Sequence, residues 1–214
     1  MNRVFLLSPA KLSGERARWI LKPDSELDLA RRLRASDGVP LGEVFSFLSA
    51  LYFRGKLAYA TAFARPPGGS PGVMIITPSA GLVPHDTPVR ISRLRGFARV
   101  PINTKHVRYR RPLARDLRRL AAATGPDCEI VLLGSIASGK YLDIVARVIG
   151  ERLRVPADFV GMGDMQRGAL LLRRVRENRE LDYVPIGALS SLPPRARKVL
   201  AARAQQDRLR PPDG

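Results

Sequence analysis

The segment that most restricts the fold of this chain covers residues 129–150 and combines three patterns in one order. Residues 130–133 form a short apolar run between Pro126 and Gly134, which is typical of a strand buried on both faces. Small polar residues follow, and from Leu142 onward the apolar side chains recur at helical spacing. This order of strand, loop and helix is a unit of an α/β sheet, in which ligands bind beyond the carboxyl ends of the strands.

Other apolar runs repeat the pattern along the chain. Strands are expected at residues 4–7, 73–77 and 152–155, and residues 41–63 have the apolar spacing of a buried helix. Alternating strand and helix patterns predict a three-layer α/β fold, with a mainly parallel sheet of about four strands flanked by helices. We expect one α/β domain in residues 1–190, followed in residues 191–214 by a basic helix and a frayed tail.

The long helix expected at residues 41–63 also carries polar residues. Gly55 is expected to divide it in two. Arg54 and Lys56, on either side of Gly55, are expected to reach solvent, while the aromatic side chains belong to the core.

The loop after residues 130–133 nearly spells a phosphate-binding motif. Residues 134–140 fit G-x-x-x-x-G-K, but Tyr141 stands where a Ser or Thr hydroxyl would bind Mg²⁺. We therefore expect no Mg²⁺-dependent hydrolysis of ATP or GTP. Two interpretations remain: a glycine-rich turn with an exposed Lys140, or a loop whose amides and Lys140 face an anion at a helix start.

The charge of the chain favours a polyanionic partner. Lys and Arg total 37 against 19 Asp and Glu, which gives a formal net charge of +18. Such a field attracts nucleic acid or anionic lipid. The alternative is a generally basic surface on an enzyme that acts on small molecules.

Over half of the excess charge lies in residues 90–119, a basic connection within the domain. Phe97, His106 and Tyr109 lie among its arginines, and bases stack on such rings while arginine contacts phosphate. Pro101 and Pro112 indicate irregular structure, and Pro112 is expected to open a helix whose outward face is basic. The alternative is a solvated connection whose aromatic residues plug the core. The candidate nucleic-acid contacts are Arg108, Arg110, Arg111, Arg115, Arg118 and Arg119.

Several kinds of site are not indicated. The only cysteine, Cys128, excludes an internal disulfide framework and is expected to be a buried, inert thiol. One Cys and two His leave no cluster of soft metal ligands, and no cofactor is predicted. The apolar start of the chain, residues 1–7, is too short for a signal peptide or a membrane span. We therefore expect a cytoplasmic protein without a membrane partner, and a monomer is favoured.

Short segments resemble known families. Ser8-Pro9-Ala10-Lys11, directly after the first strand, resembles the start of the YaaA-like peroxide-stress proteins. Residues 79–86 (SAGLVPHD) are similar to the S-A-x-x-G-L-L-x-P-D segment of a broader group, which includes the accessory domain of archaeal tRNA-guanine transglycosylases. The sequences at residues 139–141, 155–156 and 161–168 match the spacing of later motifs of that group.

This chain also departs from the group, because the gap between Ser79 and Gly81 is shorter and residues 90–92 replace a P-Y-D motif. The resemblance implies a parallel α/β core, an association with nucleic acid or modified-guanine metabolism, and a link to stress response. It also implies that the G-K-Y element is a structural turn that needs no triphosphate.

The loops that follow the expected strands should gather at one edge of the sheet, because right-handed crossovers return each strand parallel to the last. Lys11 and Lys140 would bind an anion there, and Asp86 and Asp164 would accept hydrogen bonds from an amino group or a base edge. In the plainer interpretation, Asp164 caps its helix and Asp86 closes a turn. The candidate ligand- or anion-binding residues are Ser8, Lys11, Ser79, Asp86, Gly134, Ser135, Ser138, Gly139, Lys140 and Asp164.

Three functional hypotheses follow. The main one is a nucleic-acid-binding protein, DNA or RNA, that acts on or near a modified base. The second is an enzyme on a small anionic substrate, such as a nucleotide, bound at the carboxyl ends of the strands. The third is a non-catalytic accessory protein of the ribosome or chromosome. The sequence presents no recognisable set of nucleophile, base and orienting acid, so it does not define a reaction.

Overall fold

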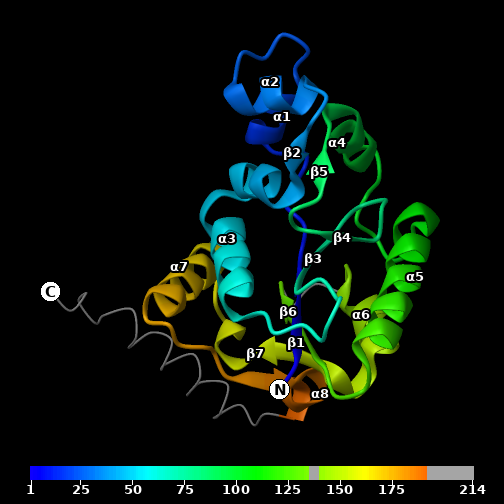
Figure 1. Ribbon diagram of the computed structural model, residues 1–214, viewed down its shortest axis with the longest axis vertical. Coiled ribbons are helices and arrows are strands. Elements are labelled where there is room, and N and C mark those ends of the chain that lie inside the picture. Colours follow the sequence, from blue (N-terminus) through cyan, green and yellow to red (C-terminus); the bar gives the residue numbers. More distant parts are fainter. Residues whose placement is uncertain (135–139, 192–214) are drawn as a thin grey trace, which may run out of the picture.

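The computed structural model describes residues 1–134 and 140–191. Within these residues, six strands form one sheet in the order β4-β3-β1-β6-β7-β8 (Figure 1). Four of them are mutually parallel, namely β1 (Arg3–Leu7), β3 (Val73–Ile76), β6 (Glu129–Leu133) and β7 (Leu153–Pro156). The two edge strands are antiparallel, namely β4 (Leu82–Pro84) and β8 (Tyr183–Pro185).

The predicted α/β class is confirmed, with a mixed and mainly parallel sheet flanked by helices. The four strands expected from apolar runs are the four parallel ones. The two further strands are three residues long. Each contains a proline, which is tolerated at a sheet edge, and neither forms an apolar run of the length that marks a buried strand.

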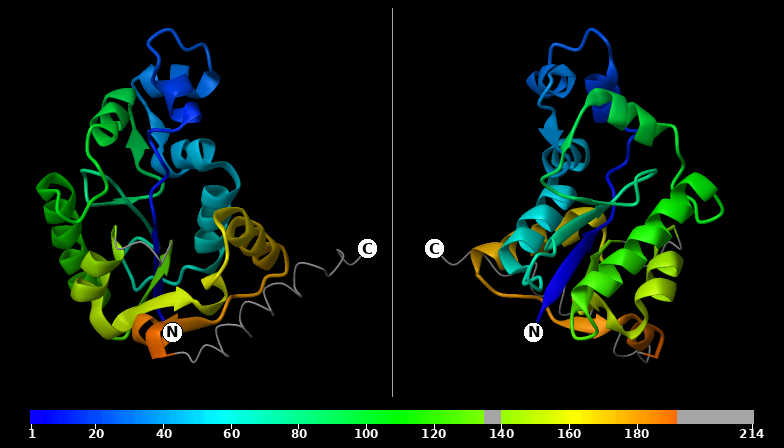
Figure 2. Two further views of the ribbon diagram at one scale, coloured as in Figure 1. Left: turned by 180° about the vertical axis from the view of Figure 1, so that it is seen from behind. Right: turned by 45° about the vertical axis from the view of Figure 1, so that its right-hand side comes forward.

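Helices cover both faces of the sheet (Figure 2). Side chains alternate along a strand, so Phe5 and Leu7 of β1 join one core cluster while Val4 and Leu6 join the other. The first cluster lies under α3 (Leu41–Phe63) and α7 (Asp164–Arg176), and the second lies under α5 (Val107–Thr124) and α6 (Leu142–Ile149). Burial of each aliphatic side chain stabilises the fold by about 1.5–3 kcal/mol. Strands without polar residues are therefore most stable between two layers of helices.

A smaller group of elements lies beyond the carboxyl end of β1, at the top of Figure 1. It makes the molecule only roughly three-layered. It comprises α1 (Glu15–Leu21), α2 (Asp28–Arg34), α4 (Ile91–Ala98) and the two-stranded sheet of β2 (Val39–Pro40) and β5 (Pro88–Val89). The remaining elements are the 3₁₀ turns η1 (Gly150–Arg152) and η2 (Ala157–Phe159) and the helix α8 (Ile186–Ser191).

Helix α3 covers the predicted residues, but the expectation that Gly55 divides it is wrong. The kink lies at Ala50, whose φ of 49° and ψ of −124° are not helical. Gly55 instead lets α3 approach α7, because a Cβ atom at Gly55 would lie 2.7 Å from the carbonyl oxygen of Gly168. A Cβ atom at Gly168 would lie 2.9 Å from the Cα atom of Tyr52. The two glycines therefore set the distance between these helices.

The basic residues 90–119 are mostly helical, which corrects the expected irregular connection. They form α4 and most of α5, joined by a turn around Pro101. Helix α5 begins at Val107, so Pro112 lies inside it and does not open it. The loss of one backbone hydrogen bond is tolerated because Tyr109 and Leu113 anchor this part of the helix in the core.

In the part of the chain that the structure describes, none of the helices is long and apolar enough to cross a membrane. The basic helix and tail were predicted for residues 191–214, of which residues 192–214 lie outside the described residues.

Candidate functional site

A cavity of about 510 Å³ lies at the carboxyl ends of the parallel strands. It is lined by Ser8 after β1, Pro78 after β3 and Tyr141 after the β6 loop, together with Tyr52 and Lys56 of α3. The strands bring these residues together from distant parts of the sequence. This is the position at which α/β proteins bind ligands.

The floor of the cavity is built where β1 and β6 end. The backbone N–H of Ser8 donates to the carbonyl oxygen of Leu133 at 3.1 Å, which extends the pairing of the two strands by one residue. A Cβ atom at Gly134 would lie 2.6 Å from the hydroxyl oxygen of Tyr141 and 2.9 Å from the Cβ atom of Ser8. Only glycine leaves room for both side chains, so Gly134 shapes the floor and the buried phenol of Tyr141 fills space beside it.

Lys56 is the most unusual residue of the cavity. Its side chain is only 2% exposed, and its Nζ atom donates to the carbonyl oxygen of Ser8 at 2.7 Å and to the Ser8 Oγ atom at 2.8 Å. The amine also lies 4.6 Å from the ring centre of Tyr52 and 4.7 Å from that of Phe53. Two hydrogen bonds and two aromatic faces therefore hold it in one position.

Burial changes the acidity of this amine. It lowers the pKa of Lys56 to about 7, because the charged form loses its hydration. The carboxylate of Asp164 opposes this fall in pKa, and the guanidinium of Arg167 adds to it. Near neutral pH the amine therefore exists in both protonation states and is able to accept a proton as well as donate one.

Tyr52 supplies a buried hydroxyl to the same cavity. Burial raises the pKa of Tyr52, and nearby Arg167 partly opposes the rise. Tyr52 is buried, with only 6% of its surface exposed. Among the described residues, its hydroxyl makes no hydrogen bond with good geometry. Arg167 interacts with this hydroxyl, and a ligand at the cavity wall would supply the well-formed hydrogen bond that buried polar groups normally have.

The rim of the cavity is charged and one wall is apolar. Lys11 and Lys140 are exposed at the rim, and the exposed carboxylate of Asp164 lies at the start of α7. The apolar lining residues come from the segment after β1, from α4 and from the turn between α4 and α5, namely Leu12, Phe97, Val100 and Ile102. The cavity therefore offers positive charge and an apolar surface to one ligand.

The structure brings together part of the predicted site. Ser8, Lys11, Lys140 and Asp164 line the one cavity, and Gly134 backs its floor. Asp164 is the first residue of α7, while Gly163 occupies the N-cap position that the plainer interpretation gave to Asp164. The predicted site residues Ser135, Ser138 and Gly139 lie outside the described residues.

Two predicted site residues do not line this cavity. Ser79 belongs to the turn between β3 and β4, in which the Thr77 hydroxyl donates to the carbonyl oxygen of Gly81 at 2.9 Å. Asp86 is exposed and follows β4, an antiparallel strand that returns the chain to the level of Val73 at the start of β3. The prediction for Asp86 fails because it assumed that this loop leaves the carboxyl edge of the sheet.

Sequence reasoning missed the role of α3. Lys56 was expected to reach solvent and is instead buried at the cavity floor. The missed signal is its place in the helical pattern, because Tyr52, Lys56, Tyr59 and Phe63 succeed one another at three- and four-residue intervals on the buried face. A lysine in the middle of an apolar stripe indicates a buried amine with a partner.

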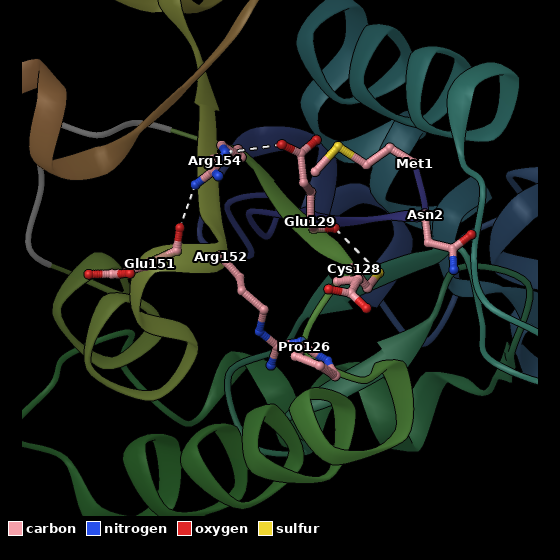
Figure 3. A pocket seen from close by; sticks show the side chains of 9 residues that line it. Met1, Asn2, Pro126, Cys128, Glu129, Glu151, Arg152 and Arg154 are labelled. Atoms are coloured by element: carbon pink, nitrogen blue, oxygen red, sulfur yellow. Dashed lines mark hydrogen bonds and ion pairs between the residues drawn. The ribbon is translucent and has the colours of Figure 1, made fainter.

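A second cavity, of about 630 Å³, lies at the opposite, amino edge of the sheet (Figure 3). Glu129 accepts hydrogen bonds there from Arg3 at 2.8 Å and from Arg154 at 3.1 Å. Arg3 also pairs with Glu180, so two carboxylates balance two guanidinium groups, and the contacts of Glu129 tie β1, β6 and β7 together. Cys128 is buried beside them, as predicted, and burial raises the pKa of its thiol. We therefore assign this edge to stability.

The six arginines predicted as nucleic-acid contacts all lie exposed on α5. Arg115 donates to Asp116 at 2.7 Å, so part of its charge is neutralised, and Arg119 lies 3.9 Å from the same carboxylate. The other candidates on this helix are Arg108, Arg110, Arg111 and Arg118.

Neither family models nor curated proteins nor solved structures match this chain. The functional argument therefore rests on the geometry of the cavity.

Proposed function

We propose that this protein is an enzyme that binds a small anionic substrate of the nucleotide class in the cavity at the carboxyl edge of its sheet. One observation carries the proposal: among the described residues that line the cavity, three are lysines, Lys11, Lys56 and Lys140, against the single acid Asp164. Three amines that converge on one cavity favour a ligand with negative charge. A cavity of about 510 Å³ also falls within the usual size range of ligand sites.

The two walls of the cavity match two parts of such a ligand. A phosphate at the rim would contact Lys11 and Lys140, and a base would pack on the apolar wall around Phe97 and Ile102. The carboxylate of Asp164 accepts hydrogen bonds and suits an amino group on a base.

Binding by calorimetry tests this function. We expect adenosine or guanosine monophosphate to bind more tightly than the corresponding nucleoside. Replacing Lys11 and Lys140 together by Ala should weaken monophosphate binding by about tenfold or more, because each lost charge contact removes part of the binding energy. The matched control replaces Lys22 and Arg179, which are exposed outside the cavity, and should bind as the wild type does. Equal binding by both double variants would refute the proposal.

We propose nucleic-acid binding as a second function, and a specific observation favours it. Exposed arginines recur along α5 at positions 108, 111, 115 and 118, the spacing of one helix face. The turn that leads into this helix lines the cavity through Pro101 and Ile102. A nucleic acid bound along α5 would thus run past the cavity mouth, which is compatible with action on or near a base.

A further inference from the structure

We propose that Ser8 and Lys56 form a nucleophile and general-base pair, and that the substrate is a carboxylic ester with an anionic group, such as an acylated nucleotide. The anionic part of this substrate rests on the proposed function, whereas the reactive pair does not. The pair lies at the cavity floor, where both residues are lining residues.

The geometry suits proton transfer from the hydroxyl to the amine. A neutral lysine amine has two N–H groups and one lone pair. One N–H donates to the Ser8 carbonyl oxygen at 2.7 Å, and the lone pair accepts the Ser8 hydroxyl proton across the 2.8 Å between Nζ and Oγ. The carbonyl contact fixes the amine, so its lone pair is aimed at the hydroxyl. This is the arrangement by which a base activates a serine.

The same surroundings assign different roles to the two residues. The Lys56 amine is enclosed by Ser8 and by the rings of Tyr52 and Phe53, so it has little freedom to attack a carbonyl carbon itself. Those ring faces also stabilise the ammonium ion that forms when the amine takes up the proton. Ser8 directly follows the central strand β1 and lines the cavity.

The reaction that follows is balanced. The Ser8 Oγ atom bonds to the ester carbon as its proton moves to Lys56, and the bond from that carbon to the leaving oxygen then breaks. Lys56 returns the proton to the leaving oxygen, and an alcohol departs. Water then attacks the acylated Ser8 with Lys56 again as the base, which releases the acid and restores the serine. Ester and water are the only reactants.

A purely structural role for Lys56 makes a different prediction. In that case the amine only holds the end of β1 through the Ser8 carbonyl group, and the Ser8 hydroxyl is no more reactive than any other serine. The charged groups that act on Lys56 are Asp164 and Arg167 of α7. Among the described residues, the other titratable groups that line the cavity are Tyr52 on the same helix, Lys11 after β1, and Lys140 and Tyr141 before α6. Asp164 raises the pKa of Lys56 and Arg167 lowers it, so the two charges oppose each other. Neither charge by itself would make the Ser8 hydroxyl reactive.

Covalent labelling distinguishes the two roles. The wild-type protein is treated separately with a fluorophosphonate and with p-nitrophenyl acetate, and adducts are located by mass spectrometry of peptides. We expect one modified residue, Ser8, with a rate that rises with pH around a midpoint of about 7 as Lys56 becomes neutral. Lys56→Met should slow labelling by about 100-fold or more, and Ser8→Ala should abolish it. Ser92→Ala, at an exposed serine of α4, should label as the wild type does.

Two outcomes overturn the pair. These outcomes are no Ser8 adduct with either reagent, or labelling that Lys56→Met leaves unchanged. If Lys56→Met does not fold, as judged by circular dichroism, the pH dependence of labelling in the wild-type protein is the test. A labelling rate without a midpoint near pH 7 would then refute the role of Lys56 as the base. Nucleotide binding without Ser8 labelling refutes the pair and leaves the proposed function standing. Ser8 labelling without nucleotide binding supports the pair and refutes the proposed function.

Discussion

Lys56 and Ser8 are 48 residues apart in the sequence, yet the amine of one lies within 2.8 Å of both oxygen atoms of the other. This contact ties the middle of α3 to the carboxyl end of the central strand β1. It also buries a basic group at the floor of the cavity that we assign to the ligand. Burial lowers the pKa of Lys56, and the reactivity proposed for Ser8 depends on the contact.

The first prediction concerns stability and pH. Burial lowers the pKa of Lys56 in the folded protein to about 7, well below its ordinary value of 10.5, so between these two pH values the unfolded chain binds more protons than the folded one. Stability therefore rises with pH above about 7 through this residue, and the burial penalty is largest at lower pH. Between pH 7 and pH 9, the free energy of unfolding of the wild type should therefore increase by about 2 kcal/mol relative to that of Lys56→Met. Urea unfolding at several pH values measures this gain, and parallel profiles for the two proteins would contradict it.

The second prediction concerns the contact between α3 and α7. Gly168→Ala would place a Cβ atom 2.9 Å from the Cα atom of Tyr52, so we expect a loss of about 1–3 kcal/mol in the free energy of unfolding. Gly96→Ala on α4 is the matched control, because a Cβ atom there meets nothing within 4 Å. That control should be as stable as the wild type or about 0.5–1 kcal/mol more stable. Equal effects of the two changes would show that the helices do not pack this closely.

The parallel core was predictable from the sequence because its strands are buried on both faces. Each such strand is a continuous apolar run, and its position requires no knowledge of the rest of the fold. The edge strands β4 and β8 were not predictable, because three residues with a proline carry no such signal. The kink at Ala50 was also hidden, since alanine favours a helix and only tertiary packing imposes its conformation there.

The site was predictable to the extent that it depends on strand ends. Ser8, Lys11 and Lys140 follow strands that run parallel, so their common edge follows from topology. Asp86 was misplaced because the antiparallel return of β4 was not seen. The position of Lys56 depends on which face of α3 packs against the sheet. Its apolar neighbours indicated that this face is buried, but Lys56 itself was expected to reach solvent.

The third prediction concerns the basic face of α5. Replacing Arg111 and Arg118 together by Gln should reduce the dependence of nucleic-acid affinity on salt by about two units of slope, because two phosphate contacts are lost. These positions are preferable to Arg115, whose guanidinium already pairs with Asp116 at 2.7 Å. A matched control replaces Arg147 and Arg176, which are exposed on other helices. Affinity is measured across a series of salt concentrations. If the α5 variant keeps the wild-type slope of affinity against salt, the α5 arginines are a solvated surface with no role in binding.

The most direct measurement of the central claim is a titration of the lysine side chains by NMR, with and without adenosine monophosphate. We predict that one of the chain's six lysines titrates near pH 7, and that its signal is missing from the spectrum of Lys56→Met. Adding the monophosphate should raise the pKa of that amine, because a bound phosphate favours the ammonium form, whereas adenosine should not. If every lysine titrates at about its ordinary value near 10, or if the monophosphate leaves Lys56 unchanged, the account of the cavity is wrong.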